Sequence, residues 1–338
     1  MLVLLATIYS CVPKPDFPQT GACAAGSFQG FAILNEGNFG NNEARIDFVY
    51  EGQDTVACIG VFSDKNGAAL GDVAQEALIS DGMLYIIVNN SHLLYELGKN
   101  DFILKRSLQL PGGLRSSPRS IRAASADKLY ITSLLDSGVY VVDKMSLQVQ
   151  SKIHLGNFPE GMALSEDHAF VALGNYVGSS LPRVGIIDIG ADSLIEVIAL
   201  PLANPGQIAI QGTSVWVACR GGFFTNDPQA GLVEIDVQTF ALKQTIPVDG
   251  NLQNELVLSD EYAYVLRDSS IARIQLSNGV VTPDWVKREA LASTEYLYPY
   301  SLSLDTKNGL LYVGMAHGLG GNGQILVLDP FDKIAGRF

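Results

Sequence analysis

The chain has 338 residues, of which 47% are hydrophobic, and a formal net charge of −13. This charge excludes nucleic acid as a partner, because proteins that bind phosphate backbones present clustered Lys and Arg side chains. The hydrophobic fraction is sufficient for a large core, and a repeat along the chain lets its length fold as one array, so we predict one folded domain.

Residues 1–10 are predicted to be a lipoprotein signal peptide. The run is apolar and ends in a small residue before Cys11, as in bacterial signal peptides whose following cysteine is lipidated. The usual basic start is missing, so either the signal peptide is truncated and its true start lies further upstream, or the run serves another purpose; it is in any case too short to span a bilayer. Residues 11–27 then comprise the lipidated Cys11 and a proline-rich tether. We expect an outer-membrane protein held by a lipid anchor and displayed at the cell surface.

Three further cysteines follow, Cys23, Cys58 and Cys219, and none has Cys-x-x-Cys spacing, so a zinc site is not indicated. Cys219 lies within an apolar run and is expected in the core. Cys23 and Cys58 either bridge the tether to the first repeat in an oxidising compartment or remain separate thiols.

An aromatic residue followed by apolar residues, a polar loop and an apolar run that often closes on Asp recurs seven times. The steps between copies range from 40 to 54 residues, which is typical of propeller blades. The first aromatics of the copies are Phe31, Tyr85, Tyr130, Phe170, Trp216, Tyr264 and Tyr312.

The copy around Trp216 accommodates four strands, at 208–210, 215–219, 232–236 and 241–246. Such runs are too short for helices and lack helical spacing. We therefore predict an all-β fold over residues 28–338, a seven-bladed β-propeller with four-stranded antiparallel blades. The inner strand of the first blade would have to precede Phe31, and residues 334–338 would form the last outer strand.

Asp143, Asp188, Asp236 and Asp329 each end the third strand of a repeat. We expect them to accept backbone hydrogen bonds in the following turns. The four histidines have no paired spacing, and no Gly-x-Ser-x-Gly motif is present. No catalytic residue, metal site or cofactor is predicted.

A propeller binds ligands where loops from all blades converge on its axis. Two loops in each blade reach that end: one precedes the innermost strand and one joins the second strand to the third. The first set supplies Gln75, Arg119, Glu160, Gln207, Asn254 and Tyr300. The second set includes Asn35, Glu36, Asn38, Phe39, Asn90, Leu135, Asn175, Tyr176, Phe223, Phe224, Arg267 and His317.

These residues combine amides with aromatic rings, which suits a bulky, largely neutral ligand. Phe223 and Phe224 are adjacent in a polar loop, so they are expected to be exposed; the alternative is that they pack on a neighbouring blade. His317 is expected to make an ordinary polar contact.

Residues 34–40, Leu-Asn-Glu-Gly-Asn-Phe-Gly, together with the Pro-x-x-apolar and strand-ending Asp phrases, resemble the YncE-like (YVTN/DUF5074-type) propeller lipoproteins of Bacteroidetes. The resemblance covers residues 28–330. This group includes the BtuG-like surface proteins, so the resemblance implies capture of cobalamin or a related corrinoid and its transfer to a TonB-dependent outer-membrane transporter.

Two alternatives to ligand capture remain. The chain is then either a scaffold for protein interaction or adhesion at the cell surface, or, less favoured, a propeller lactonase or lyase. An enzyme of the latter kind needs a metal held by carboxylates, or an acid-base His, at the axis, and only Glu36, Glu160 and His317 could serve.

Overall fold

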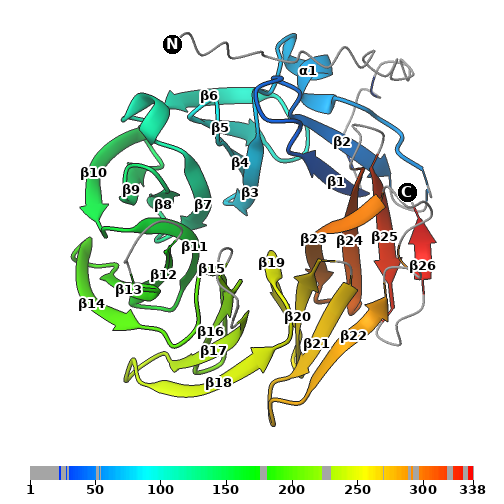
Figure 1. The fold of residues 1–338 in the computed structure, drawn as a ribbon. Helices are drawn as coiled ribbons and strands as arrows, with labels where there is room; N and C mark the ends of the chain where they lie inside the picture. The colour runs from blue at the N-terminus through cyan, green and yellow to red at the C-terminus, as the bar shows by residue number, and fades with distance from the viewer. Residues whose placement is uncertain are drawn as a thin grey trace, which may run out of the picture.

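The computed structural model describes residues 23, 28, 30–50, 53, 55–175, 181–222, 230–268, 270–287, 291, 297–317, 323–329 and 334–337. Within this part of the chain, antiparallel sheets are arranged as a ring about a central axis (Figure 1). The predicted signal segment 1–10, Cys11 and most of the tether lie outside the described residues.

Six of the sheets are four-stranded blades whose strands follow one another from the axis outward. The first three blades comprise β3 (Ala74–Ser80), β4 (Met83–Val88), β5 (Leu93–Gly98) and β6 (Leu104–Gln109); β7 (Pro118–Ala123), β8 (Lys128–Ser133), β9 (Gly138–Asp143) and β10 (Gln148–His154); and β11 (Phe158–Leu164), β12 (His168–Gly174), β13 (Arg183–Asp188) and β14 (Ser193–Ala199). A 3-10 turn, η1 (Gly113–Arg115), precedes β7.

The other three blades have the same order. They comprise β15 (Pro205–Gln211), β16 (Ser214–Cys219), β17 (Ala230–Asp236) and β18 (Leu242–Val248); β19 (Leu252–Leu258), β20 (Tyr262–Arg267), β21 (Ser270–Gln275) and β22 (Val281–Lys287); and β23 (Leu297–Asp305), β24 (Leu310–His317), β25 (Gln324–Leu328) and β26 (Ile334–Arg337). Pro283 lies in the outermost strand β22, and β26 is the predicted last outer strand.

The prediction of seven four-stranded blades is wrong: the described residues form six blades and a two-stranded sheet. That sheet pairs β1 (Gly30–Asn35) with β2 (Arg45–Tyr50). The other six repeat aromatics lie in the second strands of their blades, and Phe31 lies in β1. β1 and β2 therefore correspond to the second and third strands of a blade. In the described part of the chain, no inner strand precedes β1.

A helix and a disulfide occupy the position where the outer strand of this sheet would lie. Cys58 forms a single antiparallel bridge with Phe48 of β2 and a disulfide with Cys23, with 5.4 Å between the two Cα atoms. The short helix α1 (Val61–Asn66) follows and buries Val61 and Phe62. The chain after β2 therefore covers the sheet without a fourth strand, and the bridged arrangement of Cys23 and Cys58 is the one present.

Side chains join the two-stranded sheet to the last blade. The rings of Phe31 and Tyr312 are 5.5 Å apart, and the hydroxyl of Tyr300 donates to Glu36. Elsewhere the blades pack through apolar side chains such as Phe170 and Cys219, which are fully buried. No described helix is both long and apolar enough to cross a membrane.

Asp143, Asp188 and Asp236 accept backbone hydrogen bonds in the following turns, as predicted. A carboxylate oxygen of Asp143 accepts the N–H of Ser146 at 2.6 Å, and Asp188 accepts the N–H of Ala191 at 2.7 Å. Asp236 does the same for the turn after β17. These carboxylates fix turns at the end of the ring opposite the candidate site.

Candidate ligand-binding site

Each of the six inner strands carries a β-bulge near its start. Pairing with the second strand shifts there, for example between Pro118 and Ile121 of β7 and between Pro205 and Ile208 of β15. A bulge adds a residue that does not pair with the next strand, and it redirects a side chain. The predicted residues Gln75, Arg119, Glu160, Gln207, Asn254 and Tyr300 all lie in these bulges.

The first set of predicted residues is therefore within the inner strands rather than in the loops before them. Together with Glu36, these six residues form what we call the axial ring. Its members come from six blades and the two-stranded sheet, so residues far apart in the sequence meet at one end of the axis.

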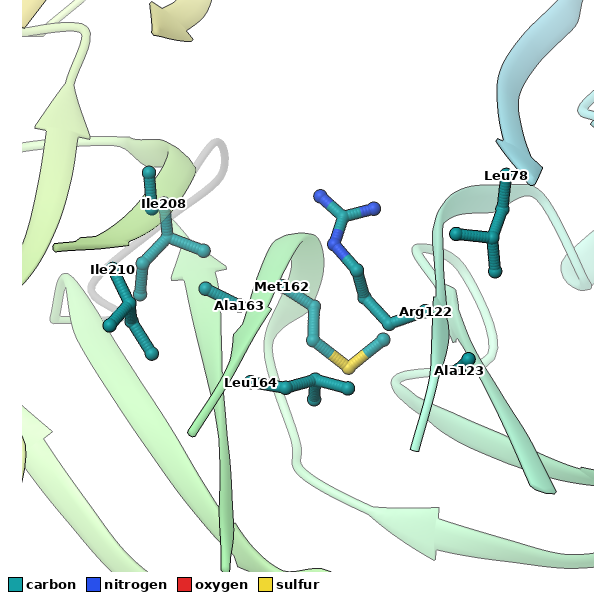
Figure 2. Close-up of a pocket in the computed structure, with 9 residues that line it drawn as sticks. Leu78, Arg122, Ala123, Met162, Ala163, Leu164, Ile208 and Ile210 are labelled. Carbon is teal, nitrogen blue, oxygen red and sulfur yellow. The ribbon is translucent and has the colours of Figure 1, made fainter. Parts of the chain in front are cut away.

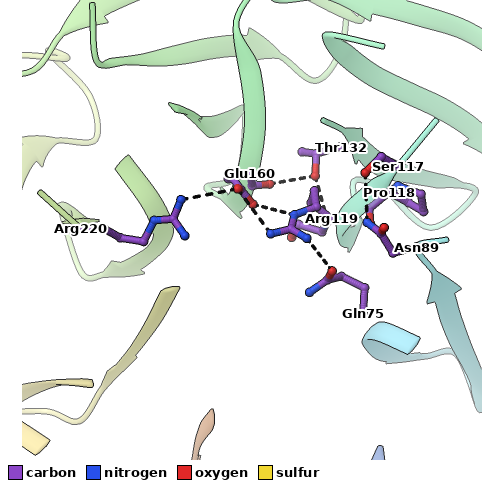
Figure 3. A network of polar contacts seen from close by, with 9 residues as sticks. Gln75, Asn89, Ser117, Pro118, Arg119, Thr132, Glu160 and Arg220 are labelled. Atoms are coloured by element: carbon purple, nitrogen blue, oxygen red, sulfur yellow. Dashed lines mark hydrogen bonds and ion pairs between the residues drawn. The ribbon is translucent and has the colours of Figure 1, made fainter. Parts of the chain in front are cut away.

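Arg119 is the centre of the best-connected part of the axial ring (Figure 3). Its Nη1 donates to Gln75 Oε1 at 2.8 Å, and its Nε donates to Glu160 Oε2 at 2.8 Å. Glu160 has a relative exposure of 1%, and Arg220 Nη2 lies 4.0 Å from its other oxygen. A buried carboxylate is stable only when paired, so the two arginines and Glu160 form one structural unit.

Two neighbouring polar side chains hold the β7 bulge in place. Thr132 Oγ1 accepts the N–H of Ser120 and donates to the carbonyl oxygen of Glu160, both at 2.8 Å. Asn89 Nδ2 donates to the carbonyl oxygen of Pro118 at 2.8 Å. These bonds satisfy bulge groups that the sheet leaves unpaired, and they fix Arg119 relative to the next blade.

Two glycines permit close approach between inner strands on the other side of Glu160. A Cβ on Gly206 would lie 1.9 Å from Asn254 Oδ1, and one on Gly161 would lie 2.8 Å from Gln207 Oε1. Both amides therefore pack directly on the backbone of the preceding blade. Asn254 Oδ1 is buried against Gly206 and has no hydrogen-bond partner among the described residues, whereas the side chain as a whole is half-buried.

Two carboxylates connect successive inner strands just beyond the bulges. Glu76 Oε2 accepts the N–H of Ile121 at 2.7 Å, and Glu255 Oε2 accepts the N–H of Leu302 at 3.2 Å. Glu76 also pairs with Arg122. The pKa of Glu255 is raised to about 8, chiefly by burial; the Leu302 N–H opposes the rise, and the nearby carboxylates of Glu76 and Glu36 contribute to it. Glu255 is therefore mostly protonated at neutral pH.

The ring of inner strands is incomplete beside β1. Ile79 on β3 is 66% exposed, and Ala77 and Ser303 are exposed as well. Their equivalents in complete blades, such as Leu164 and Ala209, pack against neighbouring blades. The missing inner strand thus leaves the axial ring wider between β23 and β3, next to Tyr300 and Glu36.

Several predicted residues instead hold loops together. Asn35 donates to Asp47 at 2.9 Å, Asn38 donates to Glu43 at 3.1 Å, and Asn90 donates to Asp72 at 2.5 Å. Asn175 Oδ1 accepts the N–H of Asn204 at 2.7 Å. Each of these amides thus makes one contact within the fold, and their role as ligand contacts stays a prediction.

The other described members of the second set have different surroundings. Arg267 extends outward to β22, where its Nη1 donates to Asp284 at 2.7 Å. Phe39 is 75% exposed, and Leu135 is also exposed. His317 ends β24 opposite Leu297. Tyr176, Phe223 and Phe224 lie outside the described residues.

The sequence analysis missed Glu76, Glu255 and Arg220. Glu76 and Glu255 each directly follow a predicted amide, in the pairs Gln75-Glu76 and Asn254-Glu255. Aligning the inner strands of the repeats would have revealed this shared position. Arg220 directly follows β16, and nothing in the repeat marks it.

The axial ring is suited to holding a molecule through many polar contacts. It presents amides, a guanidinium, a phenol and carboxyl groups from successive blades, so hydrogen bonds can form around the whole edge of a ligand. Among the described residues, no group of three or more His, Cys, Asp or Glu side chains could hold a metal ion.

Comparison with known proteins identifies the family. The model of a family described as "Domain of unknown function (DUF5074)" matches residues 29–336. The chain belongs to the DUF5074 family. The match confirms the DUF5074 type that the resemblance implied. The DUF5074 domain spans the six blades and the two-stranded sheet. No curated protein matches the chain.

Solved structures similar to this DUF5074 protein support the propeller fold. A quinonprotein alcohol dehydrogenase-like protein from Bacteroides thetaiotaomicron is 15% identical, with a TM-score of 0.70 over 91% of this chain and 75% of that one. Virginiamycin B lyase from Staphylococcus aureus is 14% identical, with a TM-score of 0.61 over 78% and 83%. Hydrazine synthase from Kuenenia stuttgartiensis is 18% identical, with a TM-score of 0.62 over 73% of each chain. At these identities the likeness concerns the fold alone.

Proposed function

We propose that this DUF5074 protein captures a bulky small molecule at the axial ring and acts by binding rather than by catalysis. Cobalamin or another corrinoid is the ligand class that we favour. The proposal includes a lipid anchor at Cys11, a position at the outer-membrane surface and delivery of the ligand to a TonB-dependent transporter.

The observation that carries the proposal is the convergence of the six bulge residues and Glu36 at one end of the axis. Gln75, Arg119 and Glu160 are linked by hydrogen bonds on one side, and Tyr300 and Glu36 are linked on the other. A different polar side chain at the same bulge of each of the six blades supports a ligand-binding role, since bulges often lie next to active sites.

The two sides of the axial ring offer different chemistry. Arg119 lies on β7, whereas Asn254 and Glu255 on β19 and Tyr300 on β23 lie on strands across the ring from it (Figure 1). A corrin ring carries primary amides around its edge, which both donate and accept hydrogen bonds. The exposed side chains of Ile79 and Ser303 leave the sector between β23 and β3 accessible to a ligand.

The test is a calorimetric titration of the purified protein with cyanocobalamin, with the visible absorbance of the corrin as a second readout. We expect one-to-one binding. Gln75→Ala and Asn254→Ala should each weaken it about five- to tenfold, since a hydrogen bond contributes about 1 kcal/mol. Arg267→Ala is the matched control, because Arg267 extends toward β22, and it should leave affinity unchanged.

The absence of heat with cyanocobalamin in the high micromolar range would remove the corrinoid assignment. Binding that Arg267→Ala weakens as much as Asn254→Ala does would place the ligand outside the axial ring. Either result would be read against the melting temperature of each variant, so that a loss of folding is not taken for a loss of binding.

A second candidate function, a surface scaffold for a protein partner, is favoured by exposed apolar side chains. Phe39, Leu114, Leu135 and Leu181 are 75%, 83%, 51% and 56% exposed, and all lie in loops at the end of the axial ring. Scattered exposed residues are common, but several at one end suit a protein contact. A Leu114→Ser, Leu135→Ser double variant that binds cyanocobalamin normally but no longer associates with intact cells would support the scaffold.

A further inference from the structure

An open cavity of about 440 Å³, shallow and accessible to solvent, lies on the inner strands β3, β7, β11 and β15, beyond the bulges that form the axial ring. Its lining is apolar except for Arg122 (Figure 2). The lining residues are Leu78, Arg122, Ala123, Met162, Ala163, Leu164, Ile208, Ala209 and Ile210. The volume is within the range of small-molecule sites.

Small residues create this space. Ala163 of β11 is paired with Phe170, and Ala209 of β15 is paired with Trp216, both large rings on the second strand. At the same position, opposite the repeat aromatic, β3 has Leu78 and β19 has Val257. Ala163 and Ala209 occupy this position in two successive blades, where β3 and β19 have branched side chains. Their small size leaves open space on the axial side of β11 and β15.

Arg122 provides the one charge of the lining, and its orientation is fixed from one side. Its Nη1 donates to Glu76 Oε1 at 2.6 Å and to the carbonyl oxygen of Ile121 at 2.7 Å. The other oxygen of Glu76 accepts the N–H of Ile121. Among the described residues, no hydrogen bond is made by Nε or Nη2 of Arg122, and the guanidinium points into the open space between Leu78 and Ala163 (Figure 2).

We propose that this cavity binds a small aliphatic carboxylate, with the alkyl chain on Ala163, Ala209 and Ile208 and the carboxylate on Nε and Nη2 of Arg122. Planar guanidinium groups bind carboxylates through two parallel hydrogen bonds. Because Glu76 occupies Nη1 only, the ligand need not displace it. The site is separate from the axial ring, so it does not depend on the identity of the captured molecule.

The experiment is a titration of the purified protein with sodium octanoate, followed by calorimetry and by the methyl resonances of Met162, Ile208 and Ile210. Octanoate should bind and shift these resonances. Arg122→Gln should weaken binding at least about tenfold, in line with the loss of a charge-assisted pair. Octanol, which has the same chain without the charge, should bind at least about tenfold more weakly than octanoate, for the same reason.

Ala209→Leu tests the cavity itself while leaving Arg122 in place. Leucine occurs at the equivalent position of β3, so the variant is expected to fold, and it should abolish octanoate binding. Val257→Leu is the matched control, since Val257 has the same position in β19 but does not line the cavity. No binding of octanoate by the folded protein, or binding that Ala209→Leu and Arg122→Gln leave intact, would overturn the proposal.

Discussion

Replacing Glu255 with Gln should change how the stability of the fold depends on pH. Burial raises the pKa of this carboxyl from its ordinary value of 4.5 to about 8. Between these two pKa values, the folded protein keeps the proton on Glu255, whereas the unfolded chain has released it. Its contribution to stability is therefore fully present below pH 4.5 and is lost as the pH rises to about 8.

The size of the effect follows from these two pKa values. At about 1.4 kcal/mol for each pH unit, the interval corresponds to at most about 5 kcal/mol of unfolding free energy. Gln keeps an oxygen that can accept the N–H of Leu302 but carries no titrating proton. The variant should thus avoid the loss, and partial exposure of Glu255 should reduce the measured difference to about 2 to 3 kcal/mol.

Urea unfolding at intervals from pH 5 to pH 9 would measure the difference. The gain in stability of Glu255→Gln over the wild type should grow by at least about 2 kcal/mol between pH 5 and pH 8. Glu261→Gln is the control, because Glu261 is an exposed carboxyl in the same blade and Glu255 remains in place, so the wild-type pH dependence should persist. A difference between Glu255→Gln and wild type that stays constant across this range would refute the reasoning.

Three further predictions concern the disulfide and the axial ring. Replacing Cys23 and Cys58 with Ser should lower the unfolding free energy by about 4 kcal/mol, because the bridge closes a loop across a sequence separation of 35 residues; a melting temperature equal to that of wild type under non-reducing conditions would contradict this. Arg119→Ala should lower the unfolding free energy by about 3 kcal/mol, since it removes the principal partner of buried Glu160. Adding Glu160→Gln should recover part of this loss in chemical denaturation. No recovery would argue against the ion pair. Tyr300→Phe should weaken cyanocobalamin binding about fivefold with little change in melting temperature, because Tyr300 is a half-exposed residue whose hydroxyl bonds to Glu36. Unchanged affinity would separate Tyr300 from the site.

The repeat aromatics made the blades predictable. Each occupies the middle of a second strand, where a large ring packs between blades, so Tyr130 and Phe170 mark positions fixed by burial. The inner-strand positions of the axial ring were predictable for a related reason, because a Pro or small residue at the strand start recurs before Arg119, Glu160 and Tyr300.

The two-stranded sheet was not predictable from the repeat. Phe31 has the expected spacing and hydrophobic neighbours, but the period gives no information about strands that are absent. The local signals were Gly60 and Gly67, which flank α1 with positive φ values of 67° and 64°, and Cys58, whose disulfide takes the place of an outer strand. These features are specific to one sector, so comparison among repeats could not reveal them.

The loop residues were the least predictable part of the site. From the sequence, an amide at the end of a second strand is equally consistent with a ligand contact and with a hydrogen bond that supports a loop. Asn35, Asn90 and Asn175 all make hydrogen bonds within the fold. Within residues 34–40, Gly40 donates its N–H to Asp72 at 2.9 Å. Much of this family motif therefore attaches the first loop to β3, and Glu36 is its contribution to the axial ring.

The most direct test of the proposed function is a crystal structure of the protein with cyanocobalamin, in which the anomalous signal of cobalt locates the corrin. Our account predicts a single strong peak on the axis, between Arg119 on one side and Asn254 and Tyr300 on the other. A peak on the outer rim, or crystals grown at saturating cyanocobalamin that show no cobalt signal, would contradict it.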